Sequence, residues 1–246
     1  MDSLLIAVWG PAGAPGRTTA AIGIARELAR AGCRTVLIDA DSYGGAVASR
    51  LGLPDEASGL AAACRLVERD GFDRAALAAV TERVPAGAEP DAPAFGVLTG
   101  IRDAGRWPEL AERPLRSVLA ALAAWSDVVV VDCGFNLEAD EEIVSDLFAP
   151  RRNQAAHAAL RAAGTVVAVV ADDPVSVDRY LCARHDAVEL APGARHLVIL
   201  NRVRSAAAAD ALERFAGIRV AAHLAEGDPD AALQAFSREI AGIAAL

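Results

Sequence analysis

The chain has 246 residues, of which 54% are hydrophobic and 23% are charged, and this composition excludes a disordered protein. The formal net charge of −9 argues against a general nucleic-acid coat protein. All 24 basic residues are arginines, because the sequence contains no lysine. A chain of this length can bury a large core in one α/β unit, so we predict a single domain over residues 1–246.

Apolar runs alternate with helix-patterned segments along the whole chain. Seven runs are short and apolar on both faces, which is typical of strands in a parallel sheet; they are residues 4–9, 35–39, 95–98, 127–132, 165–171, 196–200 and 218–222. Helical periodicity predicts helices at residues 18–31, 59–68, 74–83, 114–125, 155–162, 175–190, 206–215 and 231–244. Residues 85–93 predict a solvated loop. The alternation predicts a twisted, mostly parallel sheet of about seven strands with helices on both faces.

The cysteines, histidines and apolar segments place further limits on the protein. The four cysteines are widely spaced, and the four histidines lack metal-ligand spacing, so we expect reduced thiols and no zinc site. The N-terminal segment does not have the pattern of a signal peptide, and no apolar run reaches the ~18 residues of a membrane span. Residues 235–246 lack a basic face with bulky anchors. We therefore expect a cytoplasmic protein without a membrane anchor.

The most informative segment is GPAGAPGRTT, at residues 10–19, between the first predicted strand and the first predicted helix. Its small residues allow the backbone to curl so that N–H groups point inward, and the following helix adds the positive end of its dipole. This combination predicts a phosphate cradle. The segment departs from the P-loop pattern G-x-x-x-x-G-K-[ST], because Pro11 replaces the first glycine and Arg17 replaces the lysine. A Gly/Pro-rich turn without a ligand is the alternative.

Polar residues follow three other predicted strands at the edge where such sheets bind ligands. Asp39 and Asp41 lie at the end of the second strand, Asp132 ends the fourth, and Asn201 ends the sixth. Each has an ordinary explanation as a helix cap or a turn former. Together with Thr18, they are the residue types expected of a Mg²⁺–nucleotide site.

These motifs resemble the ParA/MinD group of P-loop ATPases with the deviant Walker A motif, which includes the CpaE/TadZ-like pilus-positioning proteins. The resemblance covers almost the whole chain and rests on GPAGAPGRTTAAIGIARELA, VLIDADSYGG, GLAAACRL, FGVLTG, DVVVVDCGFNLE and VILNRV. The stretches WGPAGAPGRTT and APRRN are similar to short CpaE/MinD-like proteins of high-GC Gram-positive bacteria, which are usually named chromosome partitioning proteins. The resemblance implies ATP and Mg²⁺ as ligands, an ATP-sandwich homodimer, and a switch that positions other machines through a protein partner that the sequence does not identify.

The resemblance also implies a role for each matching residue. Asp41 would orient the attacking water, and Arg17 stands where the family has its P-loop lysine. Asn201 would contact the adenine edge. The metal would be held or supported by Thr18, Asp39 and Asp132. The phosphates would be held by the loop and the start of the helix, which comprise Gly13, Ala14, Pro15, Gly16, Arg17, Thr18 and Thr19.

Two departures from the family pattern concern cations. Ala12 replaces the signature lysine, which in the family reaches the phosphates of the partner subunit, and Arg17 replaces the P-loop lysine. Arginine keeps the charge but has a larger, planar group. Because a cation supplied in trans can contribute ~10³–10⁵ in rate, we expect nucleotide binding to survive better than hydrolysis. The protein would be a slow ATPase at most.

Arg151 and Arg152 follow the acidic residues 138–146 and have two explanations. They are either a solvated pair at a helix start or a substitute cation at the nucleotide or the dimer face. A dimer could also gather them with Arg202 and Arg204 into a basic patch, although the net charge gives DNA binding little support.

Two other functions compete with the ATP-controlled switch. One is a pseudo-ATPase scaffold that acts through protein contacts, and the other is a small-molecule P-loop enzyme, for which the sequence has no evident second-substrate motif. Cys133 resembles a cluster-binding cysteine of nitrogenase-type iron proteins. The segment 87–107 contains no second cysteine, so we expect no iron–sulfur cluster.

Overall fold

The computed structural model describes residues 3–54, 57–69, 71–138, 151–227 and 229–244. Eight strands form one sheet in the order β3-β4-β2-β5-β1-β6-β7-β8. All neighbouring strands are parallel except β3 and β4, which are antiparallel. The strands are β1 (Leu4–Trp9), β2 (Thr35–Asp39), β3 (Glu82–Pro85), β4 (Ala94–Leu98), β5 (Val128–Asp132), β6 (Thr165–Ala171), β7 (Arg195–Val203) and β8 (Val220–Ala225). The predicted α/β architecture is confirmed, with eight strands rather than about seven.

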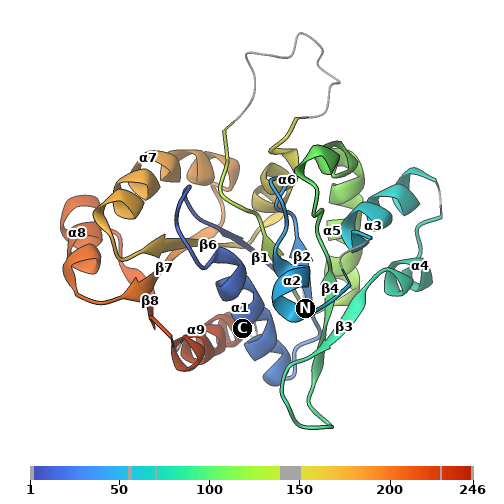
Figure 1. The fold of residues 1–246 in the computed structure, drawn as a ribbon, viewed down its shortest axis with the longest axis horizontal. Coiled ribbons are helices and arrows are strands. Elements are labelled where there is room, and N and C mark those ends of the chain that lie inside the picture. Colours follow the sequence, from blue (N-terminus) through green and yellow to red (C-terminus); the bar gives the residue numbers. More distant parts are fainter. Residues whose placement is uncertain (1–2, 55–56, 70, 139–150, 228, 245–246) are drawn as a thin grey trace.

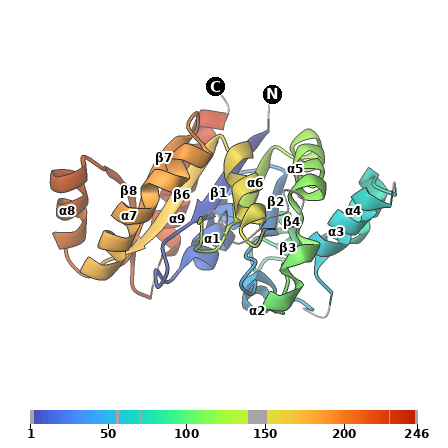
Figure 2. The same ribbon diagram turned by 90° about the horizontal axis from the view of Figure 1, so that it is seen from above.

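Helices cover both faces of the sheet. Figure 1 shows α1 and α9 on one side and α5, α6 and α7 on the other, and Figure 2 shows α4 and α8 at opposite ends of the molecule. The helices are α1 (Arg17–Arg30), α2 (Val47–Leu51), α3 (Gly59–Glu68), α4 (Arg74–Ala79), α5 (Glu112–Trp125), α6 (Gln154–Ala162), α7 (Pro174–Leu190), α8 (Ala207–Ala216) and α9 (Asp230–Ala244), with a 3₁₀ helix at Ala104–Glu109. The sequence analysis did not predict α2 or the 3₁₀ helix, both of which are short.

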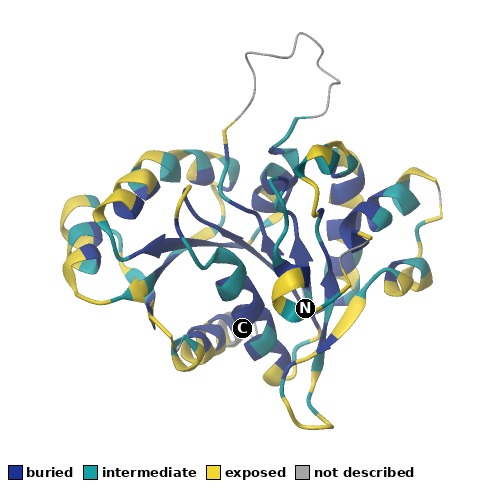
Figure 3. Ribbon diagram, in the orientation of Figure 1, coloured by how far each residue is buried: buried dark blue, intermediate teal, exposed yellow. Residues whose placement is uncertain are grey.

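The sheet divides the core into two apolar layers. Along β1, Leu5 and Trp9 enter the layer under α5, α6 and α7, whereas Ile6 and Val8 enter the layer under α1 and α9. This alternation follows from the two-residue period of a strand. Because both faces are covered, the central strands are buried along their length (Figure 3). Strands that are buried on both faces need apolar side chains on both faces, which explains the continuous apolar runs in the sequence.

The segment 74–83 does not form a single helix as predicted. Helix α4 ends at Ala79, and Glu82–Pro85 pairs in antiparallel fashion with β4. The Ala86 N–H donates to the Pro93 carbonyl at 2.7 Å and closes a hairpin over most of the predicted loop 85–93. Pro85 itself lies in β3, which tolerates a proline because it is an edge strand. The long-range pairing with β4 has overridden the local helical pattern.

Helix α1 is fixed to this hairpin at its C-terminal end. The Nε of Arg30, the last residue of α1, donates to the Ala86 carbonyl at 2.6 Å. The same guanidinium pairs with the buried Glu27 at 2.6 Å. Since α1 has 14 residues, it spans about 21 Å between its two ends.

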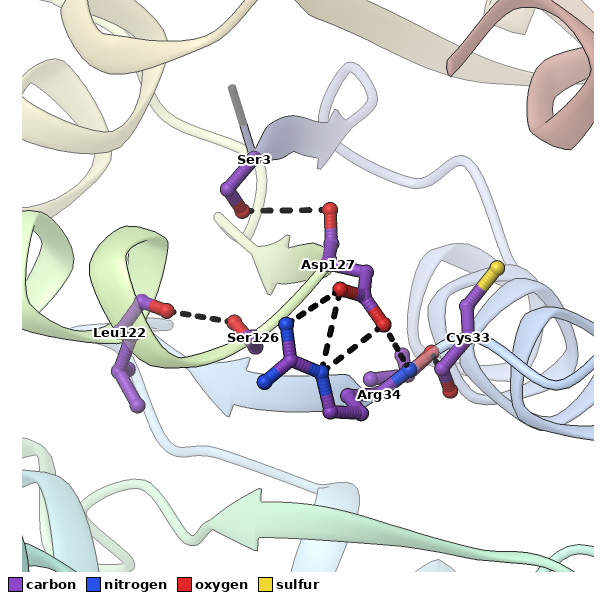
Figure 4. Close-up of polar contacts among 7 residues, drawn as sticks. Ser3, Cys33, Arg34, Leu122, Ser126 and Asp127 are labelled. Atoms are coloured by element: carbon purple, nitrogen blue, oxygen red, sulfur yellow. Dashed lines mark hydrogen bonds and ion pairs between the residues drawn. The ribbon is translucent and has the colours of Figure 1, made fainter. Parts of the chain in front are cut away.

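A polar network holds the starts of β1, β2 and β5 together (Figure 4). The carboxylate of Asp127 accepts the backbone N–H of Arg34 at 2.7 Å and a guanidinium N–H of Arg34 at 2.6 Å. The Ser3 hydroxyl donates to the Asp127 carbonyl at 3.3 Å. The hydrogen bonds from Arg34 lower the pKa of Asp127. This network lies at the amino ends of the strands, whereas the predicted site residues lie at the carboxyl ends.

Candidate functional site

The loop of residues 10–16 joins β1 to α1 at the carboxyl edge of the sheet. The Ala14 N–H donates to the Pro11 carbonyl at 3.0 Å, so the loop contains a tight turn. Gly16 has φ +100°, and a Cβ at this position would overlap the Asn201 amide. The Nδ2 of Asn201 donates to the Pro15 carbonyl at 2.9 Å. Asn201 therefore holds the loop from β7, and it lies within that strand rather than at its end as predicted.

The start of α1 leaves its N–H groups available for a ligand. No side chain of the described residues caps this helix, and its first turn contains no acidic residue. By contrast, side chains cap the N-termini of α3, α4 and α7. The N–H groups of Arg17, Thr18 and Thr19 have no partner inside the helix, and the helix dipole adds partial positive charge there. This arrangement suits an anion. Pro15 has no N–H, so its contribution to the loop is the carbonyl that Asn201 binds.

Arg17 is folded over the loop that precedes it. Its Nη1 donates to the carbonyls of Pro11 and Ala14, at 3.1 Å each, and to that of Gly10 at 3.5 Å. The centre of its guanidinium lies 5.7 Å from the centre of the Phe135 ring. Within the described part of the chain, its Nε and Nη2 make no hydrogen bond. Arg17 thus uses one nitrogen to shape the loop and leaves two for a ligand.

Asp39 is fully buried at the end of β2. Its carboxylate accepts the Val47 N–H at 3.0 Å and the Asp41 N–H at 3.3 Å. Burial raises the pKa of Asp39 well above its usual value, and the nearby Asp132 raises it further. Because its hydrogen bonds connect to both ends of the segment 41–47, Asp39 orders that segment in the described structure.

Asp132 ends β5 and is also buried, but both of its oxygens lack a hydrogen-bond partner in the described residues. Burial raises the pKa of Asp132 to about 6. The Thr18 hydroxyl and the Gly134 N–H lie close enough to lower this pKa, although neither meets normal hydrogen-bond geometry. Buried polar atoms are rarely left unpaired. Both oxygens of Asp132 therefore have hydrogen-bonding or metal-binding capacity for a ligand from outside the described chain.

Asp41 lies directly against Gly134, the second residue after Asp132. Gly134 has φ +74°, and a Cβ there would come within 2.7 Å of the Asp41 carboxyl carbon. One oxygen of Asp41 accepts the Tyr43 N–H at 2.9 Å. Burial raises the pKa of Asp41, whereas the Tyr43 N–H, Arg17 and Arg152 lower it. The structure thus brings Asp41, Asp132 and Thr18 to one place at the edge of the sheet.

Three aromatic or basic contacts around this place were not predicted from the sequence. The rings of Tyr43 and Phe135 are 4.7 Å apart between centroids, and the Arg152 guanidinium lies 4.2 Å from the Tyr43 centroid. On the other side of the loop, Arg179 of α7 donates to the Ala12 carbonyl at 2.8 Å. Tyr43 and Phe135 both belong to stretches that carried the resemblance, so their positions were the available signal. Of the acidic segment 138–146, the structure describes Glu138 alone.

Comparisons with known proteins agree with this geometry. The family model described as "CobQ/CobB/MinD/ParA nucleotide binding domain" matches residues 6–234. The chain belongs to this family. No curated protein shows significant sequence similarity to it.

Several solved structures share the fold of this chain at low sequence identity. The cell division ATPase MinD of Pyrococcus furiosus is 16% identical with a TM-score of 0.70, and the alignment covers 99% of this chain and 100% of that one. A ParA family ATPase of Chlorobium tepidum is 15% identical with a TM-score of 0.73, covering 96% and 90%. Cobyrinic acid a,c-diamide synthase of Mycobacterium smegmatis, solved with ADP and magnesium, is 19% identical with a TM-score of 0.68, covering 97% and 94%.

The residues at the edge of this MinD/ParA-type sheet fit a magnesium ion that arrives with a nucleotide. In the described ranges, no three His, Cys, Asp or Glu side chains form a metal cage. Mg²⁺ commonly binds through one or two protein oxygens together with phosphate oxygens and water. The Thr18 hydroxyl and the unpartnered oxygens of Asp132 suit that role. Burial raises the pKa of the neighbouring Cys133, which keeps this thiol protonated.

None of the described helices combines the length and the apolar character needed to cross a bilayer.

Proposed function

We propose that this MinD/ParA-type domain is a nucleotide-controlled switch that binds Mg²⁺–ATP and hydrolyses it slowly. The observation that carries the proposal is Asp132, whose two buried oxygens have no partner in the described residues and lie beside Thr18 at the uncapped start of α1. An anion site, a hydroxyl and an unpaired carboxylate at one edge of the sheet are the groups that a metal–phosphate ligand needs.

Each residue of the site has a distinct task in this proposal. The free N–H groups of α1 and the Nε and Nη2 of Arg17 bind phosphate oxygens. Thr18 and Asp132 would hold Mg²⁺, and the ion would supply positive charge opposite the phosphates. Asp39 supports the metal site indirectly by ordering the segment that carries Asp41.

The remaining predicted residues act on the attacking water and on the loop. Asp41 orients the water. Only one of its carboxylate oxygens accepts the Tyr43 N–H, and the carboxylate lies at the same edge of the sheet as Asp132. Asn201 keeps the loop in shape through Pro15 and contacts the base with its other polar atom. The loop residues Gly13 to Gly16 surround the phosphates.

Slow hydrolysis follows from the cations near the loop. The Ala12 side chain has no charge, and the Arg179 guanidinium beside it already donates to the Ala12 carbonyl at 2.8 Å. Arg17 has one nitrogen occupied by three loop carbonyls. Since phosphoryl transfer depends on stabilising developing negative charge, fewer available cations lower the rate more than they lower the affinity.

The biological role that we propose is the positioning of a cellular machine, such as a pilus, secretion or partition apparatus, in the cytoplasm. It rests on the CpaE/TadZ-like stretches of the sequence. The switch would work through a nucleotide-dependent homodimer and a protein partner.

A pseudo-ATPase scaffold is the second candidate, favoured by the way Arg17 already satisfies its own loop. Calorimetric titration of the protein with ATP and ADP, with and without Mg²⁺, separates the two. We expect Mg²⁺-dependent binding of both nucleotides and very slow phosphate release. Turnover at the rate usual for ParA/MinD ATPases would contradict the slow enzyme, and no binding at millimolar ATP would favour the scaffold.

A further inference from the structure

Three consecutive residues before and at the start of α6 each bury a polar atom without a partner in the described part of the chain. These atoms are the Nε of Arg152, the Oδ1 of Asn153 and the Nε2 of Gln154. Asn153 is held in place from its other side, because its Nδ2 donates to the Glu138 carbonyl at 2.8 Å. Two of the three unpaired atoms are hydrogen-bond donors. A ligand rich in acceptor oxygens would satisfy the two donors, on Arg152 and Gln154.

The Arg152 guanidinium lies over an aromatic ring, and no acidic side chain of the described residues forms an ion pair with it. Its guanidinium lies 4.2 Å from the centre of the Tyr43 ring, a distance at which cation–π attraction is strong. Tyr43 is itself fixed, because its ring packs on Phe135 and its hydroxyl accepts a hydrogen bond from Asn136 at 2.8 Å. The contact therefore joins the segment before α6 to the loops that follow β2 and β5.

Arg152 and Arg17 both act on Asp41. Each guanidinium lies over one ring of the Tyr43–Phe135 pair, and the Tyr43 N–H donates to the Asp41 carboxylate at 2.9 Å. Arg17 begins α1, where the phosphates would bind, while Arg152 belongs to the segment just before α6. The two guanidiniums thus lie around the same ring pair as the carboxylate that would orient the attacking water.

We propose that Arg152 contacts the terminal phosphate of a bound nucleoside triphosphate from within the same chain and so distinguishes the triphosphate from the diphosphate. This inference rests on the proposed function. A phosphate group beside Asp41 would offer acceptor oxygens to the Arg152 guanidinium, and Arg152 would offset part of the charge of that phosphate next to two carboxylates. The diphosphate lacks the group that reaches Arg152, so its binding would not depend on this residue.

The test compares ATP and ADP affinity in matched variants by calorimetry in the presence of Mg²⁺. We expect Arg152→Ala to weaken ATP binding about tenfold or more and ADP binding less than about twofold, because a charged hydrogen bond is lost only with ATP. Arg152→Lys should lie between the wild type and Arg152→Ala. Tyr43→Ala should reproduce part of the ATP-specific loss, whereas Tyr43→Phe, which keeps the ring, should lose less.

Arg50→Ala is the matched control, because it removes an exposed arginine of α2 and should leave both affinities unchanged. Thermal unfolding of every variant shows whether it is folded. An equal loss for ATP and ADP, or no loss for either, overturns the role of Arg152 while the proposed function stands. Unchanged ATP affinity with weaker ATP-dependent dimerisation would place Arg152 at a partner subunit and also overturn the inference. If the wild type binds neither nucleotide, the proposed function itself fails.

Discussion

Asp39 and Asp132 are register partners at the ends of β2 and β5, yet their carboxylates have opposite surroundings. Asp39 accepts two backbone N–H groups, whereas Asp132 has no hydrogen-bond partner in the described residues. Two buried carboxylates on adjacent strands repel each other, and this repulsion contributes to the raised pKa of Asp39. The edge of the sheet therefore carries an electrostatic cost in the absence of a cation.

The first prediction concerns the pH dependence of stability at Asp132. Its pKa is about 6 in the folded protein and near 3.8 when unfolded, so between these values the folded state binds more protons. The contribution of this group to the free energy of unfolding therefore falls as pH rises from about 4 to 7. Asp132→Asn should remove the effect and stabilise the ligand-free protein by roughly 1–3 kcal/mol at pH 7 and by much less at pH 4. Denaturant unfolding at both pH values measures the difference, and an equal effect at both would contradict the prediction.

The second prediction concerns Gly16, where the backbone and a neighbour both require glycine. Gly16→Ala places a Cβ at φ +100° and into Asn201, so we expect nucleotide binding to be lost and stability to fall by more than about 1–2 kcal/mol. Gly32→Ala is the matched control, because Gly32 has φ +91° with nothing within 4 Å of a Cβ. It should show only the backbone cost of about 1–2 kcal/mol and normal binding. Similar binding by the two variants would show that the Asn201 contact does not shape the site.

The third prediction separates the two tasks of Arg17. Arg17→Ala removes both the loop hydrogen bonds and the phosphate cation, so calorimetry should detect no nucleotide binding. Arg17→Lys keeps a cation of a shape that suits phosphate and should retain binding, with equal or faster phosphate release. Retained binding by the alanine variant would mean that the α1 N–H groups suffice without Arg17.

The fourth prediction concerns Asp41. Asp41→Ala should leave ATP affinity within about threefold of the wild type and remove residual phosphate release, because its task is to orient water rather than to bind the nucleotide. Asp41→Asn keeps the shape and the Tyr43 hydrogen bond, so it controls for disorder of the loop. Phosphate release by Asp41→Ala at the wild-type rate would remove Asp41 from the mechanism.

The fifth prediction concerns assembly. Sedimentation should show a dimer with Mg²⁺–ATP and a smaller species with ADP. The dimer should be weak, because the Ala12 side chain gives a partner subunit no charged contact. A tight dimer that forms equally without nucleotide would contradict the switch.

The central strands were predictable because β1, β5 and β6 are buried on both faces and carry uninterrupted apolar runs. Strand β3 was not predictable in this way, since Glu82 and Arg83 are exposed and the strand exists through its pairing with β4. Asn201 shows a similar limit, because β7 extends past its apolar run by pairing with β6 and β8. Pairing between distant segments leaves little trace in local composition.

The site was likewise predictable in part: its residues follow from the sequence, but several of its contacts do not. The loop and the carboxylates follow from residue type and their place after predicted strands, since parallel strands bring their carboxyl ends to one edge. The positions of Arg152 over Tyr43 and of Arg179 on Ala12 depend on side-chain packing between segments over one hundred residues apart. The sequence supplied these residues but not their contacts.

Helix α1 has the binding loop at its first residue and the β3–β4 hairpin at its last, through the bond from Arg30 to Ala86. A helix of almost four turns is stiff along its axis, so a displacement at one end is passed to the other. The hairpin and the binding loop are consequently coupled through the two ends of one helix. A protein that binds the hairpin and shifts α1 would change the affinity of the loop for its ligand without contacting the ligand.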